Sequence, residues 1–243
     1  MKKYLYQDLF ELEEVHWWHV AKRKICLTLI NKYRKNKNNI KILDIGCGTG
    51  KNLEEFSKIG KAFGIDNSID AIRFCKGKRG LKNVTLASAQ KTGFSDDAFD
   101  VVSILDVLEH TDDKKTLKEI RRILKPGGLL LITVPAFNFL WSRWDEVLHH
   151  RRRYTRDSLG RILYLSNFKV IKISYMYFFL IIPLVIIRFI KSIMFKKHYP
   201  SDFKISSNFL NKLMLAVTAL ESKLIFNCSV PVGTSLLCIC KKN

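Results

Sequence analysis

Short apolar runs recur along the first two thirds of the chain, separated by stretches that mix polar and apolar residues. These runs predict strands, and the first of them is Ile42-Leu43-Asp44, which ends in an acid. The runs that follow it are Ala62–Asp66, Asn83–Ala89, Val101–Leu105 and Leu129–Val134. A helix is predicted over Lys115–Leu124, followed by a turn at residues 125–128. Strands that alternate with helices predict an α/β fold, in which helices cover both faces of a parallel sheet.

Three glycines follow the first predicted strand at every second position. Gly46, Gly48 and Gly50 lie between Asp44 and a helix that starts at Lys51. Glycine lets the backbone turn sharply and lets a ligand approach main-chain atoms, because no Cβ is in the way. The dinucleotide fingerprint GxGxxG would need a glycine where Lys51 stands. The pattern therefore indicates a ligand-binding loop that is not built for NAD.

The spacing D-x-G-x-G-x-G resembles motif I of the class I S-adenosylmethionine (SAM)-dependent methyltransferases. The strings at 62–66, 83–89 and 101–110, and the helix, turn and strand at 115–134, resemble the later motifs of that family in the same order. The resemblance covers residues 40–135. It implies a Rossmann-like, mostly parallel sheet of seven strands in the order 3-2-1-4-5-7-6, with the last strand antiparallel. Strands six and seven would then be Phe168–Tyr175 and Thr234–Cys240.

The same resemblance implies SAM as the cofactor and S-adenosylhomocysteine as its product. Gly46 and Gly48 would offer backbone contacts to the methionine part, and Gly50 would let the helix pack closely. The other implied contacts are Asp44 to the loop or the ammonium group, Asp66 to the ribose, Asn67 over the adenine edge and Leu105 beside the methionine. Where the family usually has an acid for the adenine amino group, Ser88 precedes Ala89, so that contact is weakened or passes to Gln90.

A pair of tryptophans stands near the N-terminus. His16-Trp17-Trp18 and Arg23 resemble the HWW…R leader of a methyltransferase branch, similar to types 11 and 12, that often acts in cell-surface polysaccharide, lipid or quinone pathways. Adjacent tryptophans on a helix cannot share one face, so one is expected to pack and the other to cover the cofactor. Arg23 would reach the SAM carboxylate with its bidentate fork. The alternative is a packing aromatic pair beside a solvated arginine.

Candidate catalytic residues follow the fourth predicted strand. Asp106, Glu109 and His110 stand at i, i+3 and i+4, a spacing that places them on one helical face. Methyl transfer is a displacement at a sulfonium, so the enzyme mainly positions a nucleophile and removes its proton, for which His110 is a candidate base. Ubiquinone-type O-methyltransferases carry a similar E-x-x-E-H string that is implied to bind a divalent metal, and Asp106 replaces its first Glu. We expect no metal, and three readings stay open: a general base, these three residues as metal ligands, or structural roles.

Residues 141–154 follow the fifth predicted strand and resemble the D…HxRRY string of the same branch. The expected substrate contacts are Trp141, Asp145, His149, Arg152, Arg153 and Tyr154. Arginines bind phosphate or carboxylate groups, and His149 or His150 is able to take a proton as a catalytic base. The run precedes a predicted helix at Arg156–Leu165, so part of it is alternatively a solvated face.

Composition and charge limit the function further. The chain has 243 residues, 47% of them apolar, which is enough for one sizeable core and one domain. Its six cysteines lack zinc-site spacing and are expected to be reduced thiols of a cytosolic protein, and no signal peptide is expected. The net charge is 42 minus 22, or +20, which favours an anionic partner. Nucleic acid is not the expected one, because no N/D-P-P-Y/F string follows the fourth strand and no nucleic-acid module is recognisable.

The stretch between strands six and seven predicts two amphipathic helices. Ile173–Ile187 is apolar but shorter than the about 20 residues that a spanning helix needs. Beyond it, Arg188, Lys191 and Lys196 recur at helical spacing among aliphatic residues, a pattern typical of a basic helix that lies in a membrane interface. A second helix is predicted between Phe209 and Leu224. The alternative is a helical pair that packs on itself or on a partner subunit.

These patterns predict one methyltransferase domain with a helical N-terminal arm (1–38), a SAM-binding core (39–175), a helical insertion (176–232) and a last strand (233–243). The expected function is O-methylation of a lipid-linked, glycolipid, polysaccharide or quinone-like acceptor by a protein peripheral on the cytoplasmic face of the membrane. The alternatives are an RNA methyltransferase and a non-catalytic SAM-binding or scaffold protein. The sequence does not predict which acceptor is used or the oligomeric state.

Overall fold

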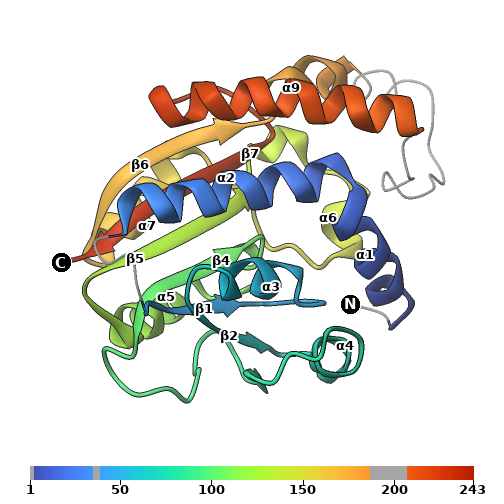
Figure 1. Cartoon of the computed structure of the whole chain (residues 1–243). Coiled ribbons are helices and arrows are strands. Elements are labelled where there is room, and N and C mark those ends of the chain that lie inside the picture. Colours follow the sequence, from blue (N-terminus) through green and yellow to red (C-terminus); the bar gives the residue numbers. More distant parts are fainter. Residues whose placement is uncertain (1–2, 35–38, 187–206) are drawn as a thin grey trace.

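A computed structural model of the chain describes residues 3–34, 39–186 and 207–243. Its strands are β1 (Lys41–Ile45), β2 (Lys61–Asp66), β3 (Val84–Leu86), β4 (Phe99–Leu105), β5 (Leu124–Pro135), β6 (Phe168–Met176) and β7 (Ser235–Lys242). They form one sheet in the order β3-β2-β1-β4-β5-β7-β6 (Figure 1). Neighbouring strands from β3 to β5 are parallel, and β7 is antiparallel to both β5 and β6. The predicted fold class and strand order are confirmed.

Helices cover both faces of this sheet. They are α1 (Lys3–Val15), α2 (Trp17–Tyr33), α3 (Lys51–Ser57), α4 (Ile69–Arg79), α5 (Asp113–Ile123), α6 (Arg143–Val147), α7 (Arg156–Leu165) and α9 (Asn208–Asn227), with the short 3-10 turns η1 (Leu108–His110), η2 (Asn138–Leu140) and η3 (Phe178–Leu180). In the view of Figure 1, α2 and α3 lie in front of the sheet, and α5 and α7 lie behind it. The central strands β4 and β5 are covered on both sides, which is why most of their side chains are apolar and fully buried.

Helix α7 has the bounds that the sequence predicts, because its start signal is local. Thr155 at the N-cap accepts a hydrogen bond from the Ser158 amide at 3.2 Å, and the Ser158 hydroxyl accepts one from the Thr155 amide at 2.9 Å. This reciprocal capping satisfies amides that a helix leaves unpaired at its start.

Two predicted strand bounds are wrong. The third strand ends at Leu86 instead of Ala89, because its neighbour β2 ends at Asp66 and offers no further pairing partner. The fifth strand is predicted to begin at Leu129, after a turn at residues 125–128, but these residues lie within β5. The pairing of β4 with β5 shifts its register there, between Phe99 and Val101 of β4. Leu124 pairs with Phe99 and Leu129 pairs with Val101, so four residues bulge out opposite Asp100 alone.

Helix α9 runs alongside α2 in the same direction (Figure 1). At one end the Asn211 side chain accepts a hydrogen bond from the Trp17 amide at 2.8 Å, and at the other end Lys32 donates to the Phe226 carbonyl at 3.0 Å. The helix predicted between Phe209 and Leu224 therefore exists and covers the N-terminal arm. The predicted basic stripe at Arg188, Lys191 and Lys196 lies outside the described residues. Within the described part of the chain, no helix has the length and apolar character to cross a bilayer.

Candidate active site

The glycine loop after β1 adopts a conformation that depends on glycine. Gly46, Gly48 and Gly50 all have positive φ angles, of 74°, 55° and 91°, which other residues seldom adopt. A Cβ on Gly46 would lie 2.3 Å from Cγ2 of Val107, and one on Gly50 would lie 2.6 Å from Cδ1 of Leu81. The loop therefore touches the turn that follows β4 on one side and the chain after α4 on the other.

Two acids frame this loop. Asp66 at the end of β2 accepts hydrogen bonds from the Gly48 amide at 3.0 Å and the Ser68 amide at 2.9 Å. Asp44 is fully buried in β1, where one carboxylate oxygen accepts from the Ser103 hydroxyl at 2.6 Å. Its other oxygen, Oδ2, is buried with no hydrogen-bond partner among the described residues, and burial raises the pKa of Asp44 to about 7. A buried acceptor without a partner fits the ammonium group of SAM, whereas the amides of Gly46 and Gly48 already donate to the Ile65 carbonyl and to Asp66.

Helix α1 lies against the glycine loop. The Thr49 hydroxyl donates a hydrogen bond to Glu13, and a Cβ on Gly48 would lie 3.7 Å from the Leu9 side chain. Arg79 on α4 joins the two, because it donates to the Thr49 carbonyl at 2.8 Å and to Glu13 at 2.7 Å. Neither Glu13 nor Arg79 was expected from the sequence, since their partners lie 30 or more residues away.

The other residues predicted to bind the cofactor lie in α2 and near the ends of strands. Arg23 is buried in α2, where burial lowers its pKa and the charge of Glu13 opposes that shift. Its predicted contact with the SAM carboxylate stays a prediction. Asn67 is exposed directly after β2, Leu105 is half-buried at the end of β4, and Ser88 and Ala89 follow β3. These four residues, unlike Arg23, lie at or just beyond the carboxyl ends of strands, where open α/β sheets bind ligands.

The expectation that Asp106, Glu109 and His110 share a helical face is wrong. Asp106 has a φ of +55°, and the 3-10 turn η1 begins only at Leu108. Asp106 instead forms an ion pair with Lys22 of α2 and accepts a hydrogen bond from Thr133 at 2.9 Å. Burial would raise the pKa of Asp106, but the charge of Lys22 and the hydrogen bonds from Lys22 and Thr133 together outweigh it and lower the pKa. Nζ of Lys22 lies over the ring of Trp18, 6.0 Å from its centre. The two residues are four positions apart in one helix, so the sequence alone places them on the same helical face.

Of the two tryptophans of α2, one packs in the core, as expected. Trp17 is buried in the core, whereas Trp18 is half-buried and stacks on Tyr177, with ring centroids 4.0 Å apart. The Tyr177 hydroxyl donates to the Trp18 carbonyl at 2.9 Å. Coverage of the cofactor by Trp18 stays a prediction.

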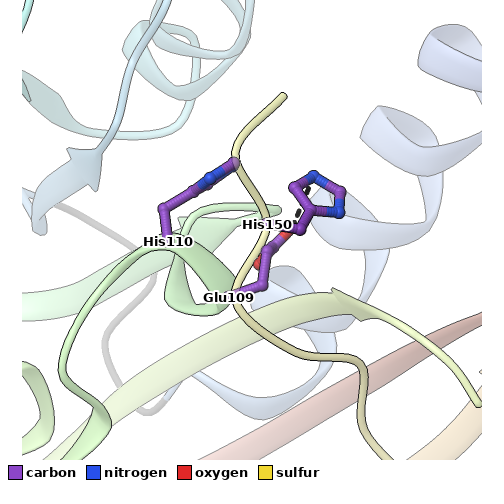
Figure 2. Close-up of side chains that lie close together, drawn as sticks. All are labelled: Glu109, His110 and His150. Atoms are coloured by element: carbon purple, nitrogen blue, oxygen red, sulfur yellow. Dashed lines mark ion pairs between the residues drawn. The ribbon is translucent and has the colours of Figure 1, made fainter. Parts of the chain in front are cut away.

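A different trio comes together next to Asp106. Glu109 and His110 come from the turn η1, and His150 comes from the extended segment that crosses it (Figure 2). One ligand atom from each lies within 4.8 Å of the others. Glu109 is fully buried, and burial raises its pKa well above the usual value. His110 and His150 lie edge to face, with centroids 4.8 Å apart. Sequence spacing missed this trio because residue 150 is remote from η1 along the chain.

Asp145 organises the segment that carries His150. It accepts two hydrogen bonds from Arg153, at 2.8 and 2.9 Å, and one from the amide of Ser142 at 2.7 Å. Its Oδ1 also lies 2.9 Å from Nδ1 of His150. Burial would raise the pKa of Asp145, but the hydrogen bonds from His150 and Arg153 outweigh it and lower the pKa.

The other predicted substrate residues are also engaged within the protein. Arg152 pairs with Asp113 at 2.7 Å, and the buried Tyr154 hydroxyl donates to the same carboxylate at 2.9 Å. Because Arg152 and Arg153 are both paired with protein carboxylates, anion recognition by these two side chains stays a prediction. Trp141 and His149 are exposed.

Comparison with known proteins supports the presence of a methyltransferase domain in this chain. The family model of a methyltransferase domain matches residues 17–173. An uncharacterized protein of Methanocaldococcus jannaschii is 31% identical over 193 residues, which are 76% of this chain and 80% of that protein. An O-methyltransferase of Aspergillus nomiae is 31% identical over 150 residues, which are 55% of this chain and 66% of that enzyme. Other curated relatives are matched over less of their own length, 36% of one and 48% of another.

A solved structure of a SAM-dependent methyltransferase from Archaeoglobus fulgidus has the same fold. It superposes with a TM-score of 0.62 at 21% identity, over 96% of this chain and 99% of that one. The likeness therefore extends to the N-terminal arm and the last strand.

Proposed function

This chain belongs to the class I SAM-dependent methyltransferases, and we propose that it is an O-methyltransferase for a lipid-linked, glycolipid, polysaccharide or quinone-like acceptor at the cytoplasmic face of the membrane. The cofactor and the general reaction follow from the family match over residues 17–173. The methylated atom, the acceptor class and the location are the proposal.

A group that handles a proton next to the cofactor loop supports O-methylation. When bound, SAM supplies an electrophilic methyl group on its sulfonium. The protein has to hold an acceptor hydroxyl in line with that methyl group and promote the loss of its proton, either as a base or through a bound cation. Glu109, His110 and His150 form such a group, and the turn that carries the first two touches the glycine loop through Val107 and Gly46. This contact between the proton-handling cluster and the cofactor loop is the observation that carries the proposal.

An exposed apolar surface supports a membrane-bound acceptor. We call it the apolar face; it consists of Ile182, Val185, Ile186, Phe209, Leu210, Leu213, Leu220 and Leu224, which are all more than a third exposed. On α9, Phe209, Leu213, Leu220 and Leu224 follow one another at spacings of four and seven residues, which place them on one side of the helix. Exposed apolar residues that gather in this way are typical of an interaction surface. The exposed Lys212 and Lys223 lie on the same helix, in a chain of net charge +20, so an anionic lipid surface is the occupant that we propose.

The residues just before the apolar face pack on the tryptophans of α2. Phe179 in the turn η3 lies 6.1 Å from the ring of Trp17, and Tyr177 just before it stacks on Trp18. Because Trp18 is the predicted cover of the cofactor, we propose that a lipid-anchored acceptor enters beside α2 and η3.

Transfer of a labelled methyl group tests the acceptor class. Purified protein is incubated with methyl-labelled SAM and with lipid, water-soluble and RNA fractions in parallel. We expect label in the lipid fraction, in a product 14 mass units heavier that carries a methyl ether or ester, and none with Asp66→Ala. Label in RNA that falls steeply with salt would replace the proposal with an RNA methyltransferase. A protein that binds SAM but labels no fraction would indicate the non-catalytic alternative.

A further inference from the structure

The carboxyl group of Glu109 lies in the interior, with an exposed fraction of 0%, and neither of its oxygens has a hydrogen-bond partner among the described residues. The cations whose charges act on it, Lys22 and Arg153, each bind another carboxylate, Asp106 and Asp145. Burial of an unpaired carboxylate is costly, and either a bound proton or a further positive charge beside it removes that cost.

His150 presents its other ring nitrogen to that carboxylate, and one ring nitrogen of His110 lies within 4.8 Å of the same group. Nδ1 of His150 lies 2.9 Å from Asp145, and Nδ1 of His110 lies 3.4 Å from the His149 carbonyl. A carboxylate and a carbonyl only accept, so each Nδ1 carries the hydrogen and each Nε2 keeps its lone pair. Nε2 of His150 is 4.0 Å from Oε1 of Glu109, a pair that the dashed line in Figure 2 marks. Histidines that bind metals are oriented by this kind of hydrogen bond at their second nitrogen.

We propose that Glu109, His110 and His150 bind one divalent cation of the Mn²⁺ or Zn²⁺ class, with Asp145 as the residue that orients His150. Two imidazoles and one carboxylate suit such ions. Bonds of about 2.1 Å to each ligand require the three atoms, now within 4.8 Å of one another, to draw closer by side-chain rotation. The remaining coordination positions are left for water or an acceptor oxygen.

The proposed cation gives the methyl transfer a way to activate a hydroxyl, and in this respect it rests on the proposed function. A cation lowers the pKa of a bound hydroxyl, which then loses its proton to water near neutral pH. The acceptor oxygen forms a bond to the methyl carbon while the carbon–sulfur bond breaks, and the electron pair of that bond stays on the sulfur. The products are the methylated acceptor, S-adenosylhomocysteine and one released proton.

Cation binding by the protein alone tests the site without any methyl acceptor. The purified chain, treated with EDTA and dialysed, is titrated with Mn²⁺ or Zn²⁺ alone by calorimetry, with the spectrum of bound Mn²⁺ as a second readout. We expect one site per chain, a loss of at least tenfold in affinity for Glu109→Gln and His150→Gln, and about a 10–100-fold loss for Asp145→Asn. His149→Gln is the matched control, because this neighbouring histidine is exposed and does not belong to the trio.

Folding of each variant is checked by its circular dichroism and by the thermal shift that SAM produces. Absence of saturable binding of either ion by the folded wild-type chain would overturn the cation site, as would equal affinity in Glu109→Gln and His149→Gln. Full methyl transfer by EDTA-treated protein would also overturn it while leaving the proposed function intact. Cation binding without any methyl transfer would instead contradict the proposed function alone.

Discussion

At the scale of single residues, buried carboxylates organise both halves of the active site. Asp66 holds the Gly48 amide at 3.0 Å, so the glycine loop and the end of β2 form one unit. Asp145 holds Arg153 and His150 within one segment, so the proton-handling cluster depends on a side chain that does not belong to it. Substitutions at these two acids therefore test different functions.

The first prediction concerns the cofactor loop. SAM or S-adenosylhomocysteine at a hundredfold excess over its dissociation constant should stabilise the wild-type fold by about 2.7 kcal/mol, and NAD should not. Asp66→Ala and Gly48→Val should lose most of this shift, because one removes the acid at the predicted ribose site and the other adds a side chain at φ +55°. Thermal denaturation with and without ligand measures it. Asp70→Ala on α4 is the control, and stabilisation by NAD but not SAM would contradict the prediction.

The second prediction concerns the ion pair between Arg153 and Asp145, whose side chains are 11% and 1% exposed. Arg153→Ala leaves a buried carboxylate that has lost two of its hydrogen bonds, so we expect a loss of about 3–5 kcal/mol in the free energy of unfolding. Urea denaturation measures it. Arg151→Ala, two residues away and exposed, should change the same quantity by less than about 0.5 kcal/mol. Equal losses for the two variants would show that the pair contributes no special stability.

At the scale of elements, α9 is held over the N-terminal arm by few polar contacts. Besides its hydrogen bonds to α2, the helix buries Glu221, whose carboxylate accepts from the Phe178 amide at 2.8 Å. Burial raises the pKa of Glu221 to about 7, and the hydrogen bond from Phe178 only partly offsets it. We therefore expect the docking of α9 on the turn η3 to depend on pH.

The third prediction follows from the sign of this shift. Between its unfolded pKa near 4.5 and its folded pKa near 7, the native state holds a proton that the unfolded state has released. Stability should therefore fall as pH rises from 5 to 8, and Glu221→Gln should reduce this fall by about 1–2 kcal/mol. Urea denaturation at several pH values measures it, with the exposed Glu146→Gln as control. A variant whose stability falls as steeply as that of the wild type would exclude Glu221 as the cause.

At the scale of the whole molecule, charge and exposed apolar area act together. The chain carries a net charge of +20, and its apolar face lies on α9 and on residues 182–186. Each basic residue near an anionic membrane contributes about 1 kcal/mol, which salt screens, whereas apolar burial in the interface is not screened.

The fourth prediction is that binding to anionic liposomes weakens but persists in high salt. Replacing Leu213, Leu220 and Leu224 with Ser should abolish the part that resists salt, while the SAM-dependent thermal shift survives. Cosedimentation with vesicles measures binding. Replacing the equally exposed Tyr164 and Leu165 of α7 with Ser is the control. Failure of the wild-type chain to bind anionic vesicles at low salt would contradict the membrane proposal and leave the apolar face for contact with another protein.

The sequence by itself determined the features that depend on neighbouring residues. The glycine loop is one, because alternating glycines after an apolar strand permit the positive φ angles of Gly46, Gly48 and Gly50. Helix α7 is another, because its capping residues lie within its first turn. The strand order was predicted through the resemblance that these local motifs carry, and the structure confirms it.

Only the tertiary structure decided which side chains meet. Asp106 leaves the expected helical face because its backbone is left-handed and Lys22 of α2 binds it, and His150 joins Glu109 and His110 from a segment about 40 residues away. Arg152 and Arg153, read as anion-binding residues, are paired with Asp113 and Asp145. The physical reason is that ion pairs and buried hydrogen bonds depend on distances in space, which the spacing of residues along a chain determines only within one helix or strand.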